Sequence, residues 1–91
     1  MGLDDTMRAL ADPTRREILR RLRERDMTAG EIAALFPITP ASTSHHLSVL
    51  KDAGLIQATR DGRNIVYSLD ATVFQELLKE MLDFFGVGGE R

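Results

Sequence analysis

The sequence predicts a mainly α-helical domain that carries one small β-hairpin. Apolar residues recur at intervals of three and four in five segments, as on helices that pack along one side. Two of these segments are separated by only a few residues, which is typical of a helix-turn-helix. Alternating apolar and polar residues around an Asp-Gly pair at residues 56–69 then predict an antiparallel hairpin. The expected fold class is a winged helix-turn-helix with five helices and a two-stranded wing.

Composition fits one folded domain spanning residues 1–91, with a flexible tail at residues 86–91. Hydrophobic residues make up 43% of the 91 positions, and the net charge is −2. The chain has no cysteine, which excludes disulfides and thiolate chemistry and fits a reducing compartment. It has neither a membrane-length apolar run nor a signal-like N-terminus. We therefore expect a cytoplasmic protein.

The first two helices are predicted on either side of Asp12-Pro13. Leu3, Met7 and Leu10 are spaced as one face of a short helix, which the proline ends. Asp12 can cap the next helix, where Pro13 is tolerated because a first-turn residue needs no N–H. The residues that this second helix is expected to bury are Ile18, Leu19 and Leu22.

The third and fourth helices have clear start and stop signals. Thr28 and Glu31 form a capping box that opens the third helix, which Pro37 closes. Thr39 caps the fourth helix, and Gly54 ends it in a left-handed conformation. The inward residues expected on these two helices are Ile32, Leu35, Phe36, Thr43, Leu47 and Leu50.

The wing is predicted to turn at Asp61-Gly62. This register places Arg60 opposite Arg63, where like charges repel by about half a kcal/mol. Phosphates would supply the missing counter-charge. The alternative is that both arginines only keep a sheet edge soluble. The other facing pairs in this register are Ala58 with Ile65 and Ile56 with Tyr67.

The last helix is predicted to begin at a second capping box, Thr72 to Gln75. It carries more apolar residues than a small core can bury, and a second apolar surface usually binds another subunit. We therefore expect a homodimer that is held together by the last helix with help from the first. The expected seam residues are Leu3, Met7, Leu10, Val73, Leu77, Met81, Phe84 and Phe85.

The exposed face of the fourth helix indicates contact with DNA. It carries hydroxyls and imidazoles, and no charged residue before Lys51, whereas a merely solvated helix face is usually rich in Glu, Lys and Arg. The expected contacts from this helix and the wing are Thr39, Ser42, Thr43, Ser44, His45, His46, Lys51, Arg60 and Arg63. His46 flanks the apolar stripe, so its ring is also a candidate for bridging helices. Arg15 and Arg16 are expected either to approach phosphates or to pair with acids such as Asp12.

The sequence predicts no enzyme, metal or cofactor. His45 and His46 point about 100° apart on a helix and have no cysteine or carboxylate at ligand spacing. The neighbouring hydroxyls have no oriented acid partner that would make them nucleophiles.

Four segments of the chain resemble the ArsR family of bacterial repressors, and within it the short, metal-free, SdpR-like branch: residues 13–19, 44–50, 54–56 and 60–69. The resemblance implies a dimeric winged helix-turn-helix whose fourth helix reads the major groove while the wing touches backbone or minor groove. It also implies a bacterial protein that is associated with the nucleoid. The chain departs from the family at Pro40-Ala41, where a polar residue commonly supplies a base contact. It also lacks the cysteines at positions 28–30 and the last-helix histidines of metal-sensing members, so metal sensing is not implied.

These observations predict a dimeric, sequence-specific repressor, or autorepressor, that occupies a promoter operator. The alternative is a winged-helix module that binds another protein and not DNA, which the negative net charge favours. No residue indicates what relieves repression. An inducing protein, a small ligand and dilution all remain open.

Overall fold

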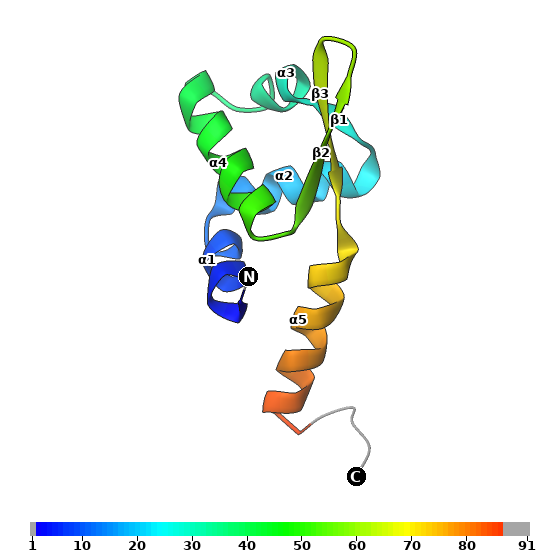
Figure 1. The fold of residues 1–91 in the computed structure, drawn as a ribbon. Coiled ribbons are helices and arrows are strands. Elements are labelled where there is room, and N and C mark those ends of the chain that lie inside the picture. The colour runs from blue at the N-terminus through cyan, green and yellow to red at the C-terminus, as the bar shows by residue number, and fades with distance from the viewer. Residues whose placement is uncertain (1, 87–91) are drawn as a thin grey trace.

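The computed structural model describes residues 2–86, which form five helices and a three-stranded antiparallel sheet (Figure 1). The helices are α1 (Leu3–Leu10), α2 (Pro13–Glu24), α3 (Ala29–Ala33), α4 (Pro40–Asp52) and α5 (Ala71–Phe84). The strands are β1 (Met27–Thr28), β2 (Ile56–Asp61) and β3 (Asn64–Leu69). Helices α3 and α4 form the helix-turn-helix, and β2 and β3 form the wing, so the predicted fold class is confirmed. No helix within residues 2–86 has both the length and the apolar character needed to span a membrane.

Polar side chains start α3 and α4 as predicted. Thr28 Oγ1 accepts a hydrogen bond from the Glu31 N–H at 3.1 Å, and the Glu31 carboxylate accepts one from the Thr28 N–H at 2.8 Å, which completes the capping box. Thr39 Oγ1 accepts from the Ser42 N–H at 3.1 Å. These bonds satisfy first-turn N–H groups that have no partner inside their own helix. Helix α3 ends at Ala33, earlier than expected.

Gly54 ends α4 in the predicted left-handed conformation, with a φ of 79°. Its N–H donates to the Lys51 carbonyl at 2.9 Å, and the Leu55 N–H donates to the Leu50 carbonyl at 3.0 Å. This pair of bonds is the Schellman motif, which satisfies carbonyls at the end of a helix. The turn also directs Leu55, whose exposure is 0%, into the core.

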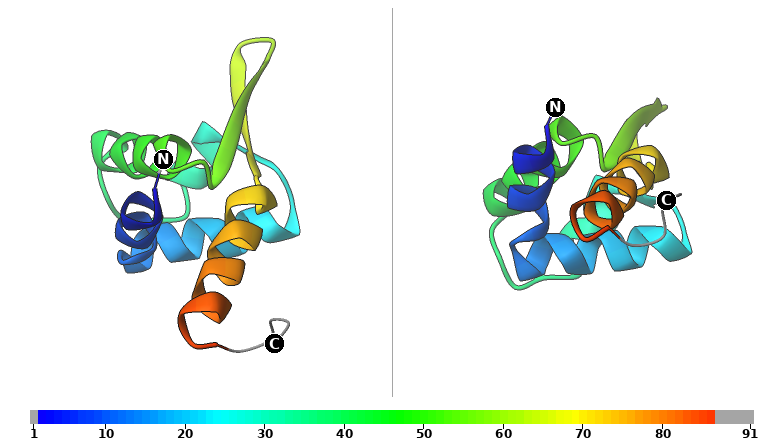
Figure 2. Two further views of the ribbon diagram at one scale, coloured as in Figure 1. Left: turned by 60° about the horizontal axis from the view of Figure 1, so that its bottom comes forward. Right: turned by 90° about the horizontal axis from the view of Figure 1, so that it is seen from below.

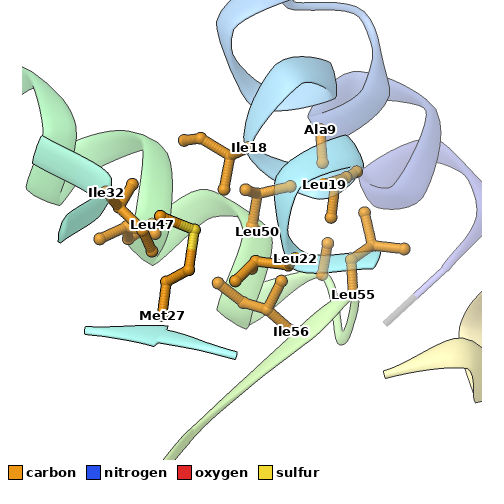
Figure 3. Packing of buried hydrophobic residues seen from close by; sticks show 11 residues of the cluster. Ala9, Ile18, Leu19, Leu22, Met27, Ile32, Leu47, Leu50, Leu55 and Ile56 are labelled. Carbon is orange, nitrogen blue, oxygen red and sulfur yellow. The ribbon is translucent and has the colours of Figure 1, made fainter. Parts of the chain in front are cut away.

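One hydrophobic core joins α1, α2, α4 and the strands to the short α3 (Figure 3). The largest side chains that are completely enclosed are Ile18, Ile32, Leu50 and Leu55. They come from α2, α3, α4 and the turn after α4, so the core fixes α4 relative to the other elements. Truncating one such side chain to alanine typically costs about 2–5 kcal/mol.

The sheet contains a strand that the sequence did not reveal. Its order is β1-β3-β2, and β1 places Met27 opposite Tyr67 and Thr28 opposite Val66. Two residues are too few to show an alternating pattern. By pairing with β3, this strand joins the wing to the segment that leads directly into α3.

The predicted turn of the wing was wrong. Asp61 pairs with Asn64, so the two turn residues are Gly62 and Arg63. Gly62 has a φ of 64° and Arg63 has a negative φ, as in a type II′ turn with glycine at its first central position. A turn at Asp61-Gly62 would have required the left-handed conformation at the aspartate as well.

The corrected register keeps the predicted faces of the wing. Ile56 lies opposite Leu69 rather than Tyr67, and Ala58 lies opposite Tyr67 rather than Ile65. Each partner has moved by two residues, and side chains alternate with a period of two. Arg60 lies opposite Ile65, so the expected repulsion between facing arginines does not exist.

Helix α5 begins two residues earlier than predicted. Asp70 is its cap and accepts a hydrogen bond from the Thr72 N–H at 3.0 Å, so no capping box forms between Thr72 and Gln75. The helix has no buried residue and extends away from the tip of the wing (Figures 1 and 2). Of the expected tail, residues 86–91, only Gly86 lies within the described residues.

Candidate nucleic-acid interface

The side chains of α4 divide between the core and an exposed polar face. Leu47 and Leu50 are buried, and so is Thr43, which is 3% exposed and donates its hydroxyl to the Thr39 carbonyl at 3.3 Å. Thr43 was expected both in the stripe and among the DNA contacts, and its burial places it in the core. The exposed residues of α4 that the sequence singled out are Ser42, Ser44, His45 and Lys51, and Ser48 is exposed on the same helix.

The exposed face is polar without being acidic. No carboxylate occurs between Thr39 and Lys51. At its N-terminal end, the Thr39 hydroxyl donates to the Ser42 hydroxyl at 3.1 Å, which holds both oxygens at the start of the helix. Short hydroxyls can approach base edges without repelling phosphates. The N-terminal end of α4 and the tip of the wing lie at the end of the molecule opposite α5 (Figure 1).

His45 and His46 have different surroundings. The His45 side chain is exposed, whereas that of His46 is 16% exposed and lies beside Arg15 and Asp12 of the α2 start. The two ring centroids are 6.0 Å apart. Within the described residues, no group of three His, Cys, Asp or Glu side chains is placed to hold a metal ion. His46 thus has the helix-bridging position that its place beside the stripe suggested.

Arg15 and Arg16 bind the end of α1 rather than an acid. Arg15 Nε donates to the Ala9 carbonyl at 2.8 Å and Nη2 donates to the Arg8 carbonyl at 3.1 Å. Arg16 Nη1 donates to the Leu10 carbonyl at 2.8 Å. These carbonyls lie in the last turn of α1, where carbonyls lack the usual partner four residues on and attract positive charge; that of Arg8 also accepts from the Ala11 N–H at 3.2 Å. The sequence signal for this arrangement is the short link between α1 and α2, which lets first-turn side chains of α2 reach back.

Asp12 holds its charge at the junction of these groups. Burial favours the neutral acid, but the hydrogen bond from the Arg15 backbone N–H at 3.0 Å and the positive charge of the Arg15 guanidinium outweigh it, so the pKa of Asp12 is lowered below its usual value. Its Oδ2 lies 3.8 Å from His46 Nδ1. The carboxylate therefore caps α2 and faces the imidazole of α4.

The cations of the wing and of the end of α4 are available to a ligand. Arg60, Arg63 and Lys51 are exposed, and none of them forms an ion pair within residues 2–86. Arg60 Nη1 donates only to the Gly62 carbonyl, at 3.3 Å. Arg63 is in the turn itself. This placement suits contact with phosphates, which attract unpaired cations.

A second candidate surface lies on α5 and consists of exposed apolar side chains. Those on α5 and the following residue are Leu78, Met81, Leu82, Phe84 and Phe85, with exposed fractions from 36% to 74%, and Met7 of α1 is 48% exposed. Leu78 and Leu82 were not among the expected seam residues, although their spacing from Met81 and Phe85 is that of one helix face. The more enclosed seam candidates are Leu3, Leu10, Val73 and Leu77. Three of these, Leu3, Val73 and Leu77, line a cavity of about 370 Å³ between α1 and α5.

Comparison with known proteins agrees with this geometry. Residues 12–58 match the family described as bacterial regulatory protein, arsR family. The chain is 46% identical over 86 residues to the transcriptional repressor SdpR of Bacillus subtilis, covering 94% of this chain and 96% of that protein. It is 39% identical over 77 residues to the transcriptional regulator NmtR of Mycobacterium tuberculosis, covering 85% of this chain and 64% of that protein.

A solved structure shows the same arrangement of elements. The chain superposes on an ArsR-like transcriptional regulator from Rhodococcus sp. RHA1 with a TM-score of 0.80 and 30% identity. The match covers 92% of this chain and 78% of the Rhodococcus chain. The matched proteins are transcriptional regulators, as expected for a chain that is not an enzyme.

Proposed function

The chain belongs to the arsR family of bacterial regulatory proteins and is a transcriptional regulator with a winged-helix DNA-binding fold, and we propose that it acts as a homodimeric repressor of its own promoter. Two copies of α4 would enter successive major grooves about 34 Å apart and exclude polymerase. The observation that carries this proposal is the exposed face of α4, which is polar and free of acids as far as Lys51, beside a wing whose arginines have no acidic partner within residues 2–86. Acting on chromosomal DNA, the protein would work on the nucleoid in the cytoplasm.

Sequence reading is assigned to α4. Ser44 and His45 project from the exposed face, and both can form hydrogen bonds with base edges in the major groove. Ser42 and Thr39 are tied together at the start of the helix, where N–H groups and hydroxyls favour a phosphate oxygen. Discrimination between operators then rests mainly on Ser44 and His45.

Positioning is assigned to the wing and Lys51. Arg60 and Arg63 lie near or in the turn and are fully charged at neutral pH. Phosphate contacts carry no sequence information but release counterions, which makes affinity depend on salt. The negative net charge of the chain does not oppose this, because α5 holds three of the acids and extends away from the wing (Figure 1).

The dimer is assigned to the apolar surface of α5 together with α1. Each large apolar side chain removed from water contributes about 1.5–3 kcal/mol, so several on each copy would hold two chains together. The seam would bring a second α4 to the DNA. The inducing signal, a partner protein or a ligand, is not assigned to any residue.

The test is a salt titration of the purified protein on its own upstream DNA and on random DNA. His45→Ala should weaken binding to the cognate site by about 1–3 kcal/mol and change random binding much less. Arg63→Ala should weaken both and reduce the slope of log affinity against log salt by about one. Lys79→Ala, which removes a cation from α5, is the matched control and should change neither.

Three results would each contradict a part of the proposal. If the wild-type protein shows no preference for its upstream DNA, it is not an autorepressor. If it binds no duplex even at low salt, the winged helix serves another kind of partner. If His45→Ala and Arg63→Ala change cognate affinity, random affinity and salt dependence in the same way, α4 does not read sequence separately from the wing.

A further inference from the structure

One side chain connects α1, which contributes to the proposed dimer, with α4, the helix proposed for reading DNA. Arg15 donates from Nε and Nη2 to the Ala9 and Arg8 carbonyls at the end of α1, at 2.8 and 3.1 Å. Its Nη1 lies 3.2 Å from His46 Nδ1 on α4. The guanidinium is planar and rigid, so the three contacts fix α1, α2 and α4 relative to one another. Within residues 2–86, the Arg16 side chain donates to the Leu10 carbonyl and forms no hydrogen bond or ion pair with α4.

The chemistry of the contact determines the protonation of His46. A guanidinium can only donate hydrogen bonds, so His46 Nδ1 must accept, and the ring proton must be on Nε2. A protonated ring would place a second donor 3.2 Å from Arg15 Nη1. The nearest carboxylate oxygen, Asp12 Oδ2, lies at 3.8 Å, which is beyond hydrogen-bond range, and it already accepts from the Arg15 N–H. The ring that fits this site is therefore neutral.

The other ring nitrogen reaches the surface. His46 Nε2 has no hydrogen-bond partner within residues 2–86, and no buried side-chain nitrogen or oxygen in that range is unpaired. Nε2 is thus in contact with solvent. In the form that Arg15 requires, it presents an N–H donor from a ring that carries no charge.

We propose that Arg15 is a positioning residue, which fixes the orientation and tautomer of His46 and thereby locks α4 to the end of α1. The role rests on the proposed function, because it matters to operator binding only if α4 reads DNA. Arg15 itself makes no phosphate contact in this role. Its side chain is used within the protein, and its effect on DNA passes through His46 and through the angle between α1 and α4.

A double-mutant cycle on operator DNA tests the connection. Arg15→Ala and His46→Ala should each weaken cognate binding about tenfold, and the double variant should lose little more than either single one. Arg16→Ala is the matched control, since Arg16 also binds the end of α1 but forms no hydrogen bond with α4, and its effect should add to that of His46→Ala. His46→Asn, which keeps an acceptor near the Nδ1 position, should recover most of the lost affinity only when Arg15 is present.

The salt dependence separates positioning from contact with DNA. A positioning residue lowers cognate affinity and leaves the salt slope unchanged, whereas a lost phosphate contact reduces the slope by about one. Thermal unfolding of each variant shows whether Arg15→Ala folds. If it does not, Arg15→Lys replaces it, because lysine keeps the charge but lacks the planar fork of donors that reaches the α1 carbonyls and His46 together. Nitrogen NMR of the free wild-type protein then locates the ring proton of His46 without reference to DNA.

The proposal is supported if the cycle shows coupling for Arg15 but not for Arg16, the slope is unchanged, and Nδ1 is unprotonated. It is overturned if Arg15→Ala flattens the slope by about one, if the Arg15 and His46 losses simply add, or if the proton is on Nδ1. Failure of the wild-type protein to bind any operator would refute the proposed function. In that case the position of the ring proton, and its change in Arg15→Lys, still decides whether Arg15 sets the tautomer.

Discussion

Replacing Leu78 by glutamate tests whether α5 forms the dimer seam. Leu78 is 59% exposed in the single chain, so a seam that covers it removes that fraction of the side chain from water. Complete burial of a leucine contributes about 1.5–3 kcal/mol, and the exposed fraction therefore contributes about 1–2 kcal/mol per chain. A symmetric seam contains the residue twice, which gives about 2–4 kcal/mol per dimer.

The glutamate should raise the dimer Kd by about 30- to 1,000-fold, because each 1.4 kcal/mol is a factor of ten. Burying its charge would raise the Kd further. Sedimentation velocity across a concentration series measures the effect, and operator affinity should fall in parallel. Lys79→Gln changes the net charge by the same single unit on the polar side of α5 and should leave the Kd unaltered. Equal Kd values for Leu78→Glu and wild type, or a wild-type monomer at micromolar concentration, would refute the reasoning.

Other perturbations act on local structure. Gly62→Ala should destabilise the wing by about 1–2 kcal/mol through the φ of 64° alone, since the added carbon would meet no neighbouring atom within 4 Å. Chemical unfolding measures this loss of stability, which should be smaller for Gly62→Asn. Thr28→Ala should lower the free energy of unfolding by about 1 kcal/mol through loss of the cap, while Thr28→Ser should not. The hydrogen bond from Gln57, followed by that from the Thr72 N–H, lowers the pKa of Asp70. The ionised Asp70 carboxylate therefore stabilises the fold above the usual pKa of 3.8, and this stabilisation is lost as the pH falls through the lower pKa of the folded state. Asp70→Asn should therefore give a shallower loss of stability in acid, and identical acid unfolding curves would contradict this. Chelators should leave operator affinity unchanged, and a tenfold shift on adding zinc, about 1.4 kcal/mol of coupling, would disprove metal independence.

Features that depend on neighbouring residues could be predicted from the sequence. The caps at Asp12, Thr28 and Thr39 and the stop at Gly54 each require only a few adjacent positions, and all four are confirmed. The polar face of α4 could be predicted for the same reason. The apolar side chains of α5 were identified from the sequence, but the half-buried ones could not be distinguished from the exposed ones.

Features that depend on distant segments could not be predicted. Shifting the pairing of β2 and β3 by two residues leaves each side chain on the same face of the wing. The alternation of apolar and polar residues therefore could not decide between turns at Asp61-Gly62 and Gly62-Arg63. The strand β1 exists only because β3 pairs with it. The contacts of Arg15 required knowledge of where α1 ends relative to α4, and charge alone suggested an acid or a phosphate.

Asp70 links three parts of the molecule through its own atoms. Its N–H donates to the Leu55 carbonyl at 2.9 Å, its Oδ2 accepts from Gln57 of β2 at 2.8 Å, and its Oδ1 starts α5. The direction in which α5 leaves the sheet is therefore set at one residue. In a dimer joined through α5, that direction determines how far apart the two reading helices stand. Substitutions at this corner should change the preferred distance between operator half-sites and leave the preferred bases within each half-site unchanged.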